Sequence, residues 1–407
     1  MRLSLTPKGR LFLLTIFLLS LVAGYFYRKY RPPYGFYAEL ARRELTESRR
    51  LINGFGHKYV KFRQLQGAGF NNQAQEILLF HHLALLTNRI YVYQPFMWRH
   101  RLELQPLSGF LLGPTKGSLS SALFEEVCPP EEVRNVTINV EPYAEMWRTA
   151  QDILNGPERC IYVENWILNW RFLESPAIHD IWPAYKTYLS QYYEWPSHIL
   201  DMIYRAGVEL NLRSHPALTD GEPYLAIHFR RGDFEEHCQY LSKTQQPFTS
   251  WSTLPDIQSH SAFPPRLDTS NETSIMEHCY PTLDRILDTI DAQVRNRPHL
   301  RSVYVLHDGA WDHLPVYWQY YKIERALKNS ARARKAGWKG DTVGMRFITH
   351  SGMTPVKPGE RDWKVAVDVE LARRAEVFIG NGFSSLTSQI VALRLADGGK
   401  AEDITIL

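Results

Sequence analysis

Two arginines, a glycine and an aspartate stand directly after an apolar run, in residues 228–233 (HFRRGD). The preceding residues, 224–229 (YLAIHF), have the composition of a buried strand, so the charges lie where a strand ends. Open parallel sheets bind ligands at this end, and the planar guanidinium group of arginine presents paired N–H donors that match a phosphate. A phosphate site is one explanation of the pattern. Surface ion pairs of the arginines with Asp233 or Glu235 are the other.

Two further polar segments also follow apolar runs. Residues 67–73 (GAGFNNQ) combine glycines, which let backbone N–H groups approach a ligand, with amides at the start of an expected helix. Residues 380–389 (GNGFSSLTSQ) begin a helix with Ser and Thr, whose hydroxyls and free N–H groups together can bind a phosphate. For each segment alone, ordinary capping of a helix by Asn or Ser explains the pattern as well.

The elements that must position these segments alternate along the chain. The apolar runs that predict strands lie at residues 59–65, 90–93, 224–229, 301–307, 345–349 and 376–380. Helical patterns lie between them, at residues 73–86, 283–294, 316–328 and 365–375. Residues 95–216 show no clean periodicity, and the polar, turn-rich residues that follow mark a boundary. Two α/β domains with a cleft between them are therefore expected.

Length, composition and charge exclude one class of protein. A chain of 407 residues with 44% hydrophobic residues can bury more than one core. The formal net charge is +4, but the first fifty residues hold ten basic and three acidic side chains, so the rest of the chain carries −3. A nucleic-acid-binding protein needs basic residues spread over its folded body, so this class is excluded.

The basic residues near the N-terminus surround an apolar segment. Residues 11–27 contain no charged side chain, and as a helix they would rise about 25 Å, which suits the thinner membranes of the early secretory pathway. We expect an uncleaved type II signal anchor here. A cleaved signal peptide is the alternative, and it is disfavoured because Leu21-Val22-Ala23 is a poor cleavage site.

Four cysteines and two sequons are compatible with an oxidising lumen. The cysteines can form two disulfides in three pairings, of which the sequence-local one joins Cys128 to Cys160 and Cys238 to Cys279. Buried free thiols are the alternative. The sequons begin at Asn135 and Asn271, a number close to chance.

In their order along the chain, the three polar segments resemble the donor-binding motifs of the GDP-fucose O-fucosyltransferase family. In that family, a glycine-rich loop with Asn precedes the first helix, and a His-x-Arg at a strand end holds the pyrophosphate. An Asp before a Ser-Ser-Phe/Leu-Thr segment recognises guanosine, and here Asp368 precedes Ser384 by sixteen residues. The HxRRGD form is also similar to the motif of α1,2- and α1,6-fucosyltransferases that act on glycans. The matched motifs cover only a small part of the chain.

The resemblance implies a role for each matched residue. It places Arg230 on the β-phosphate and Asn71 near the phosphates or the fucose, and it makes these two the candidate catalytic residues. The remaining candidates for binding of the donor are Gly67, Gly69, Phe70 and Asn72, His228 near the nucleotide, Asp368 on the guanine, and Ser384 and Ser385 on the phosphates.

One position departs from the family's pattern. Some protein O-fucosyltransferases have a Glu between the two glycines of the first motif as the proposed base, whereas this chain has Ala68. The base that activates the acceptor is therefore not identified. The chain also lacks the Asp-x-Asp motif with which many glycosyltransferases hold a cation, so we expect neither a metal nor a cofactor.

The fold implied by the resemblance is α/β and GT-B-like, with two Rossmann-like domains that face a cleft. Ahead of them we expect a single transmembrane helix. The expected parts are a cytoplasmic tail and anchor at residues 1–27, a stem at 28–57, an N-terminal acceptor-side domain at 58–222 and a C-terminal nucleotide-sugar-binding domain at 223–407. The alternative to a stem is an ordinary N-terminal helix around residues 37–51.

The implied activity is that of an inverting, metal-independent glycosyltransferase that moves L-fucose from GDP-fucose to a hydroxyl of a lumenal protein. The alternatives are a glycan fucosyltransferase of the α1,2 or α1,6 type and an inactive lumenal protein that binds nucleotide sugars. The expected partners are GDP-fucose, a protein or glycan acceptor and, through residues 11–27, a membrane. The expected location is the Golgi or the endoplasmic reticulum.

Overall fold

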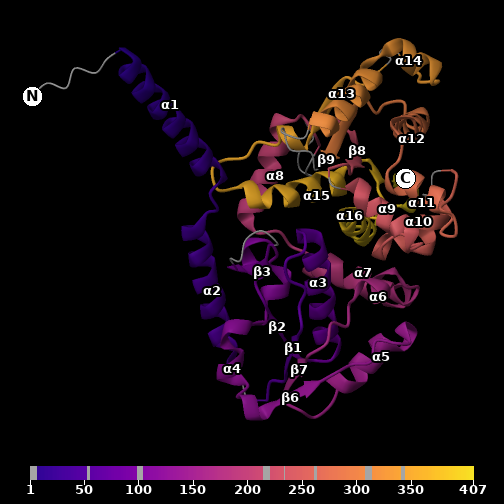
Figure 1. Cartoon of the computed structure of the whole chain (residues 1–407). Coiled ribbons are helices and arrows are strands. Elements are labelled where there is room, and N and C mark those ends of the chain that lie inside the picture. The colour runs from indigo at the N-terminus through magenta and orange to yellow at the C-terminus, as the bar shows by residue number, and fades with distance from the viewer. Residues whose placement is uncertain are drawn as a thin grey trace, which may run out of the picture.

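The computed structural model describes residues 7–52, 56–98, 104–213, 221–232, 234–260, 264–307, 314–340 and 344–407. Within them the chain forms an N-terminal and a C-terminal half, each built on a parallel five-stranded sheet (Figure 1). Both sheets are covered by helices on their two faces. This is the arrangement that buries the near-continuous apolar strands of a parallel sheet.

The sheet of the N-terminal half has the strand order β5-β2-β1-β7-β6, and all its neighbours are parallel. Its strands are β1 (Tyr59–Phe62), β2 (Ile90–Tyr93), β5 (Leu119–Ser120), β6 (Val133–Val136) and β7 (Cys160–Val163). Helices α3 (Phe70–Leu86) and α5 (Tyr143–Leu154) contribute to the core on one face. Helices α2 (Tyr34–Ile52) and α4 (Phe124–Val127) lie on the other.

The sheet of the C-terminal half has the order β10-β9-β8-β11-β12 and is also parallel. Its strands are β8 (Tyr224–Phe229), β9 (Ser302–His307), β10 (Phe347–His350), β11 (Val377–Gly380) and β12 (Ile404–Ile406). Helices α12 (Leu283–Asn296) and α13 (Leu314–Lys328) pack on one face. Helices α15 (Lys364–Arg374) and α16 (Ser385–Ala396) pack on the other.

The two halves share one apolar core. It includes residues of β1 and α3 in the N-terminal half and of β8, α15 and α16 in the C-terminal half. Helices α7 (Ala177–Tyr192) and α8 (Ser197–Glu209) contribute to the same core. Helix α8 packs on α15, and α7 packs on α16. A core that is continuous across both sheets holds the ends of their strands close together.

The remaining elements surround this frame. They are α1 (Pro7–Tyr30), the β3 (Phe96–Met97) and β4 (Leu104–Gln105) pair, α6 (Trp170–Glu174), α9 (Phe234–Lys243), α10 (Pro255–His260), α11 (Glu272–Cys279) and α14 (Ser330–Lys335). The disulfides are Cys128–Cys160 and Cys238–Cys279, so the sequence-local pairing is confirmed.

The structure bears on two expectations for the N-terminal segment. Part of the expected stem is helix α2, whose Tyr37 and Leu40 are buried against the N-terminal half, because its apolar side chains complete the core there. The membrane-spanning prediction for residues 11–27 is not confirmed: measured by length and hydropathy, the helices of the described part of the chain include none that could cross a membrane.

Candidate functional site

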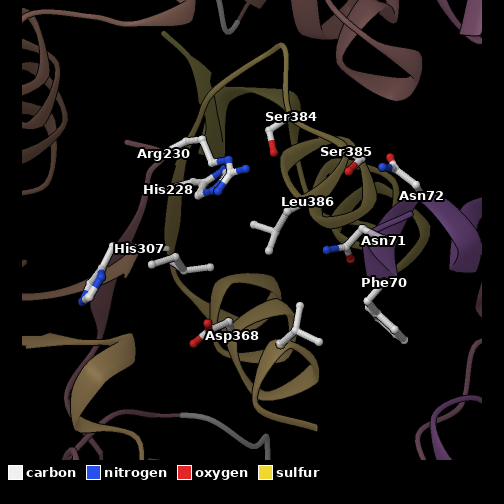
Figure 2. Close-up of a pocket in the computed structure, with 13 residues that line it drawn as sticks. Phe70, Asn71, Asn72, His228, Arg230, His307, Asp368, Ser384, Ser385 and Leu386 are labelled. Atoms are coloured by element: carbon white, nitrogen blue, oxygen red, sulfur yellow. The ribbon is translucent and has the colours of Figure 1, made fainter. Parts of the chain in front are cut away.

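A pocket of about 400 Å³ lies where the two halves meet (Figure 2). Its walls come from the first turn of α3, the ends of β8 and β9, helix α15 and the start of α16. The lining residues are Gly69, Phe70, Asn71, Asn72, His228, Arg230, Leu306, His307, Val365, Asp368, Ser384, Ser385 and Leu386. The three polar segments of the sequence therefore meet in one place.

The two adjacent arginines after β8 have different surroundings. The Arg230 side chain lines the pocket, and its Cζ atom lies 4.9 Å from the ring centre of Phe234. Arg231 is only 2% exposed and donates a hydrogen bond to the carbonyl oxygen of Pro281. Its Cζ atom lies 4.1 Å from the ring centre of Tyr280. Arg230 is thus the arginine available to a ligand, and Arg231 holds the adjacent loop.

His228 is buried behind Arg230. Its Nδ1 atom and the hydroxyl oxygen of Thr387, on α16, lie 3.0 Å apart. Burial, together with the nearby charge of Arg230, lowers the pKa of His228 to about 3. The imidazole is therefore neutral near pH 7, and it links β8 to α16 while Arg230 carries the positive charge.

The start of α16 forms a second wall rich in hydrogen-bond donors. Ser384 is the N-cap residue, yet its side chain makes no capping hydrogen bond within the described residues. Its hydroxyl and that of Ser385 lie at the pocket (Figure 2). The first N–H groups of a helix have no partner within the helix itself. Such a helix end attracts anions because its N–H groups and its dipole act together.

The loop before α16 requires glycine for close packing. A Cβ atom on Gly380 would lie 2.3 Å from Cγ2 of Thr387, and one on Gly382 would lie 2.4 Å from the ring of Phe248. Asn381 fixes the loop by donating to the carbonyl of Cys279 at 2.6 Å, next to a disulfide. The Cys238–Cys279 disulfide therefore supports the loop that carries Ser384.

Asp368 lies at the other end of the pocket. The hydroxyl of Tyr304 donates to its Oδ1 atom at 2.5 Å. Burial raises the pKa of the Asp368 carboxyl, while the charge of Lys364 and the hydrogen bond from Tyr304 act in the opposite direction. A carboxylate fixed on one oxygen keeps accepting capacity for N–H donors of a ligand.

His307, at the end of β9, lines the pocket near Asp368 (Figure 2). Its Nε2 atom lies 2.8 Å from Nδ1 of His350, which also accepts a hydrogen bond from the backbone N–H of Gly352 at 3.1 Å. Burial, with the charge of His307, lowers the pKa of His350 to about 4. Nδ1 of neutral His350 is an acceptor. Nε2 of His307 is therefore protonated and donates the hydrogen bond between the two rings.

The opposite wall comes from the glycine turn and the first turn of α3. Gly67 has φ of +72°, which favours glycine, and donates to the carbonyl of Met97 at 2.9 Å. Gln73 fixes the same turn by donating to the carbonyls of Ala68 at 2.7 Å and Met97 at 2.9 Å. The Oδ1 atom of Asn71 is buried and has no hydrogen-bond partner within the described residues. The amide of Asn71 and the guanidinium of Arg230 project into the pocket from opposite sides (Figure 2).

The structure brings together nine of the ten predicted site residues. Gly67 is the exception: it lies outside the lining and shapes the turn that leads to Gly69. The lining residues that sequence reasoning missed are Leu306, His307, Val365 and Leu386. His307 ends an expected strand, so the rule that identified Arg230 would have found it as well. Among the described residues, no group of three or more His, Cys, Asp or Glu could hold a metal ion, and metal independence remains a prediction.

Comparisons with known proteins place the fold. A scan of the sequence against protein-family models gives no match, and a search of curated proteins gives none either. Among solved structures, the chain is similar to glycosyltransferase structures with this two-sheet α/β fold. The protein in them is POFUT1: its complex with GDP-fucose aligns with a TM-score of 0.52 and 13% identity, over 87% of this chain and 98% of POFUT1.

Two further POFUT1 structures give the same picture. The complex with GDP aligns with a TM-score of 0.50 and 16% identity, over 86% of this chain and 98% of POFUT1. The apo form aligns with a TM-score of 0.52 and 13% identity over the same shares. The chain thus has the same fold as the POFUT1 chain in these structures, across nearly all of that chain's length.

Proposed function

We propose that this protein is a GDP-fucose-dependent fucosyltransferase that transfers L-fucose to a hydroxyl group of a protein acceptor. The observation that carries the proposal is the pocket itself, where a cationic side chain, a helix N-terminus and a half-buried carboxylate meet an uncharged amide wall. The motifs that resemble those of GDP-fucose O-fucosyltransferases converge there. The likeness to POFUT1, which has been crystallised with GDP-fucose, supports the same donor and a GT-B fold.

The C-terminal half would bind GDP and stabilise its departure. Negative charge develops on the β-phosphate as the bond to fucose breaks, and Arg230 with the first turn of α16 would neutralise this charge. These fixed donors would replace a metal ion. Asp368, held by Tyr304, would accept hydrogen bonds from guanine N–H groups and so select the base.

The N-terminal half would position the sugar and the acceptor. The amide of Asn71, which projects into the pocket, would contact the fucose or the phosphates of the donor. Direct displacement at the anomeric carbon by an acceptor hydroxyl would invert its configuration. Position 68 is alanine, so no carboxylate stands in the glycine turn to take the acceptor's proton.

A lumenal location in the Golgi or the endoplasmic reticulum fits the chemistry of the body. The two disulfides require an oxidising compartment to form and persist. Both sequon asparagines, Asn135 and Asn271, are exposed and so accessible to glycosylation. An endoglycosidase-sensitive mass shift that is lost in Asn135→Gln and Asn271→Gln would test this location.

The activity is tested by incubating the purified protein with GDP-fucose, GDP-mannose and UDP-sugars, with and without candidate acceptors and EDTA. We expect release of GDP from GDP-fucose in preference to the other donors, and no effect of EDTA. Turnover of a UDP-sugar in place of GDP-fucose would refute the donor. Binding of GDP without turnover of any donor would favour the inactive, nucleotide-sugar-binding alternative.

A further inference from the structure

Gln75 connects the two walls of the pocket. It lies one helical turn after Asn71 on α3 and is only 4% exposed. Its Nε2 atom donates to the backbone carbonyl of Ser385, the first residue of α16, at 2.9 Å. Gln75 belongs to the N-terminal half, whereas Ser385 lines the pocket from the C-terminal half.

The amide of Gln75 uses its full hydrogen-bonding capacity. Its second N–H is directed at the carbonyl of Asn71, 3.2 Å away. Its Oε1 atom accepts hydrogen bonds from the hydroxyls of Ser388 at 3.1 Å and Ser250 at 3.3 Å. Two donors and two acceptor sites exhaust what a glutamine amide offers.

This pattern fixes the orientation of the amide. Rotation by 180° would place Oε1 against the two carbonyl oxygens of Asn71 and Ser385, where neither side can donate. The hydroxyl of Ser388 extends the link, because it also accepts a hydrogen bond from the backbone N–H of Trp251 at 3.0 Å. Three segments that are distant in the sequence, α3, residues 250–251 and the start of α16, therefore meet at one buried side chain.

The link joins the backbone at the two helix starts that form the pocket. A shift of α16 relative to α3 would stretch or break the bond between Gln75 and Ser385. The same shift would change the separation of Asn71 from Ser384 and Ser385. A displacement of about 1 Å between reacting groups can cost a hundredfold in rate, so this separation matters for transfer.

We propose that Gln75 is a positioning residue that holds the sugar-side wall of the pocket in register with the phosphate-side wall. This inference rests on the proposed fucosyl transfer. Gln75 touches neither the pocket lining's charged groups nor the reacting atoms, so it acts through Asn71 and Ser385. Its loss should lower turnover while GDP, which binds to the C-terminal wall, keeps its affinity.

The test compares Gln75→Glu and Gln75→Ala with the matched control Gln293→Glu. Gln293 lies on α12 outside the pocket lining and bonds Thr405 at 2.9 Å and Arg297 at 2.6 Å. We expect both Gln75 variants to lower kcat by about tenfold to a hundredfold, with the Kd for GDP within about threefold of wild type. The control should keep both values.

The outcomes are separable. Near-wild-type kcat in both Gln75 variants would overturn the proposal, and so would a loss of kcat and GDP affinity in equal proportion. If Gln75→Glu does not fold, a double-mutant cycle of Gln75→Ala with Ser388→Ala decides, since one shared link predicts strongly non-additive losses. Strictly additive losses would contradict it.

A second readout needs no turnover. GDP should slow hydrogen exchange at the backbone amides of residues 70–76 in the wild type, because Gln75 transmits the ordering of α16 to α3. This protection should disappear in Gln75→Ala, and its persistence would contradict the proposal. Failure of the wild type to bind GDP would instead count against the proposed function.

Discussion

The two walls of the pocket differ in chemistry. The wall from the C-terminal half carries the ionisable side chains Arg230, Asp368, His228 and His307, supported by the start of α16. The wall from the N-terminal half consists of Gly69, Phe70, Asn71 and Asn72, which carry no charge. The charged wall and the amide wall therefore suit two different roles. The first wall suits binding of a charged leaving group, and the second suits placing of an uncharged sugar and acceptor.

This difference has a kinetic consequence. Interactions with the charged part of the donor contribute to ground-state binding as well as to the transition state, so their loss should affect GDP affinity. Contacts that only align the sugar act mainly in the transition state, so their loss should affect turnover. Variants on the two walls should therefore fall into two kinetic classes.

The largest effect is expected from Arg230→Lys. Lysine keeps the charge but loses the planar pair of donors, so stabilisation of the departing phosphate should fall. We expect turnover of GDP-fucose to drop by roughly a hundredfold or more, beyond any loss of GDP affinity. Steady-state kinetics and calorimetric titration with GDP measure the two quantities on the same preparation.

Arg231→Lys is the matched control. Arg231 contacts Pro281 and Tyr280 rather than the pocket, so its replacement should lower the melting temperature first and turnover much less. Near-normal turnover in Arg230→Lys together with abolished turnover in Arg231→Lys would reverse the assignment. It would also contradict the role of the charged wall in binding the leaving group.

Asp368→Asn should have the next largest effect, and on the same wall. The amide preserves shape but replaces an acceptor with a donor, so guanine N–H groups would lose a charged partner. We expect the Kd for GDP to rise about tenfold or more and the preference over other nucleoside diphosphates to shrink. Nucleotide titrations with GDP, ADP and UDP measure both.

Tyr304→Phe serves as the control for orientation alone. It removes the hydrogen bond to Asp368 but leaves the carboxylate in place. Its effect on GDP affinity should be smaller, about threefold, which is less than the net contribution of one charged hydrogen bond. A change in Asp368→Asn confined to kcat would place this residue in the wrong kinetic class.

How much of this arrangement the sequence predicts differs between the halves. Four of the five strands of the C-terminal half were predicted, because they lie in apolar runs such as the fully buried residues 224–229. The residues after them could then be placed at one edge of a sheet. The three-residue strand β12 was missed. In the N-terminal half, no strand was predicted within residues 95–216, because β5 has only two residues and β6 is exposed at two of its four positions.

Gln73 and Gln75 show a second limit. On the sequence they are two polar residues at the start of a helix, and capping explains such residues adequately. Their partners, Met97 and Ser385, lie 24 and 310 residues away along the chain. Only the tertiary fold shows that these amides connect the glycine turn and the two walls.

On the uncharged wall, Asn71→Ala should lower turnover and spare GDP. The amide of Asn71 lines the pocket on this wall, and its loss removes one hydrogen bond to the donor or acceptor. We expect kcat to fall about tenfold, with a change in GDP affinity below about threefold. Asn296→Ala, at an exposed position at the end of α12 and outside the pocket lining, is the control. An equal loss of GDP affinity in Asn71→Ala would remove the distinction between the walls.

The smallest effect concerns His228, the residue of the charged wall that stays neutral. Its pKa is lowered to about 3 in the folded protein, against about 6.5 in the unfolded chain. Between these values the unfolded state binds the extra proton, so the contribution of His228 to stability is complete above pH 6.5 and is lost as the pH falls. From pH 7 to pH 6 this single group should lower the free energy of unfolding by about 0.7 kcal/mol. His228→Asn can keep a hydrogen bond to Thr387 but does not titrate, so denaturant unfolding of the variant should lack this increment. Because His228 remains neutral throughout, GDP affinity of the wild type should not change with its titration between pH 6 and pH 8. A difference in unfolding free energy between pH 7 and pH 6 that is equal in the two proteins would show that His228 titrates normally, and the charged wall would then gain a second cation in mild acid.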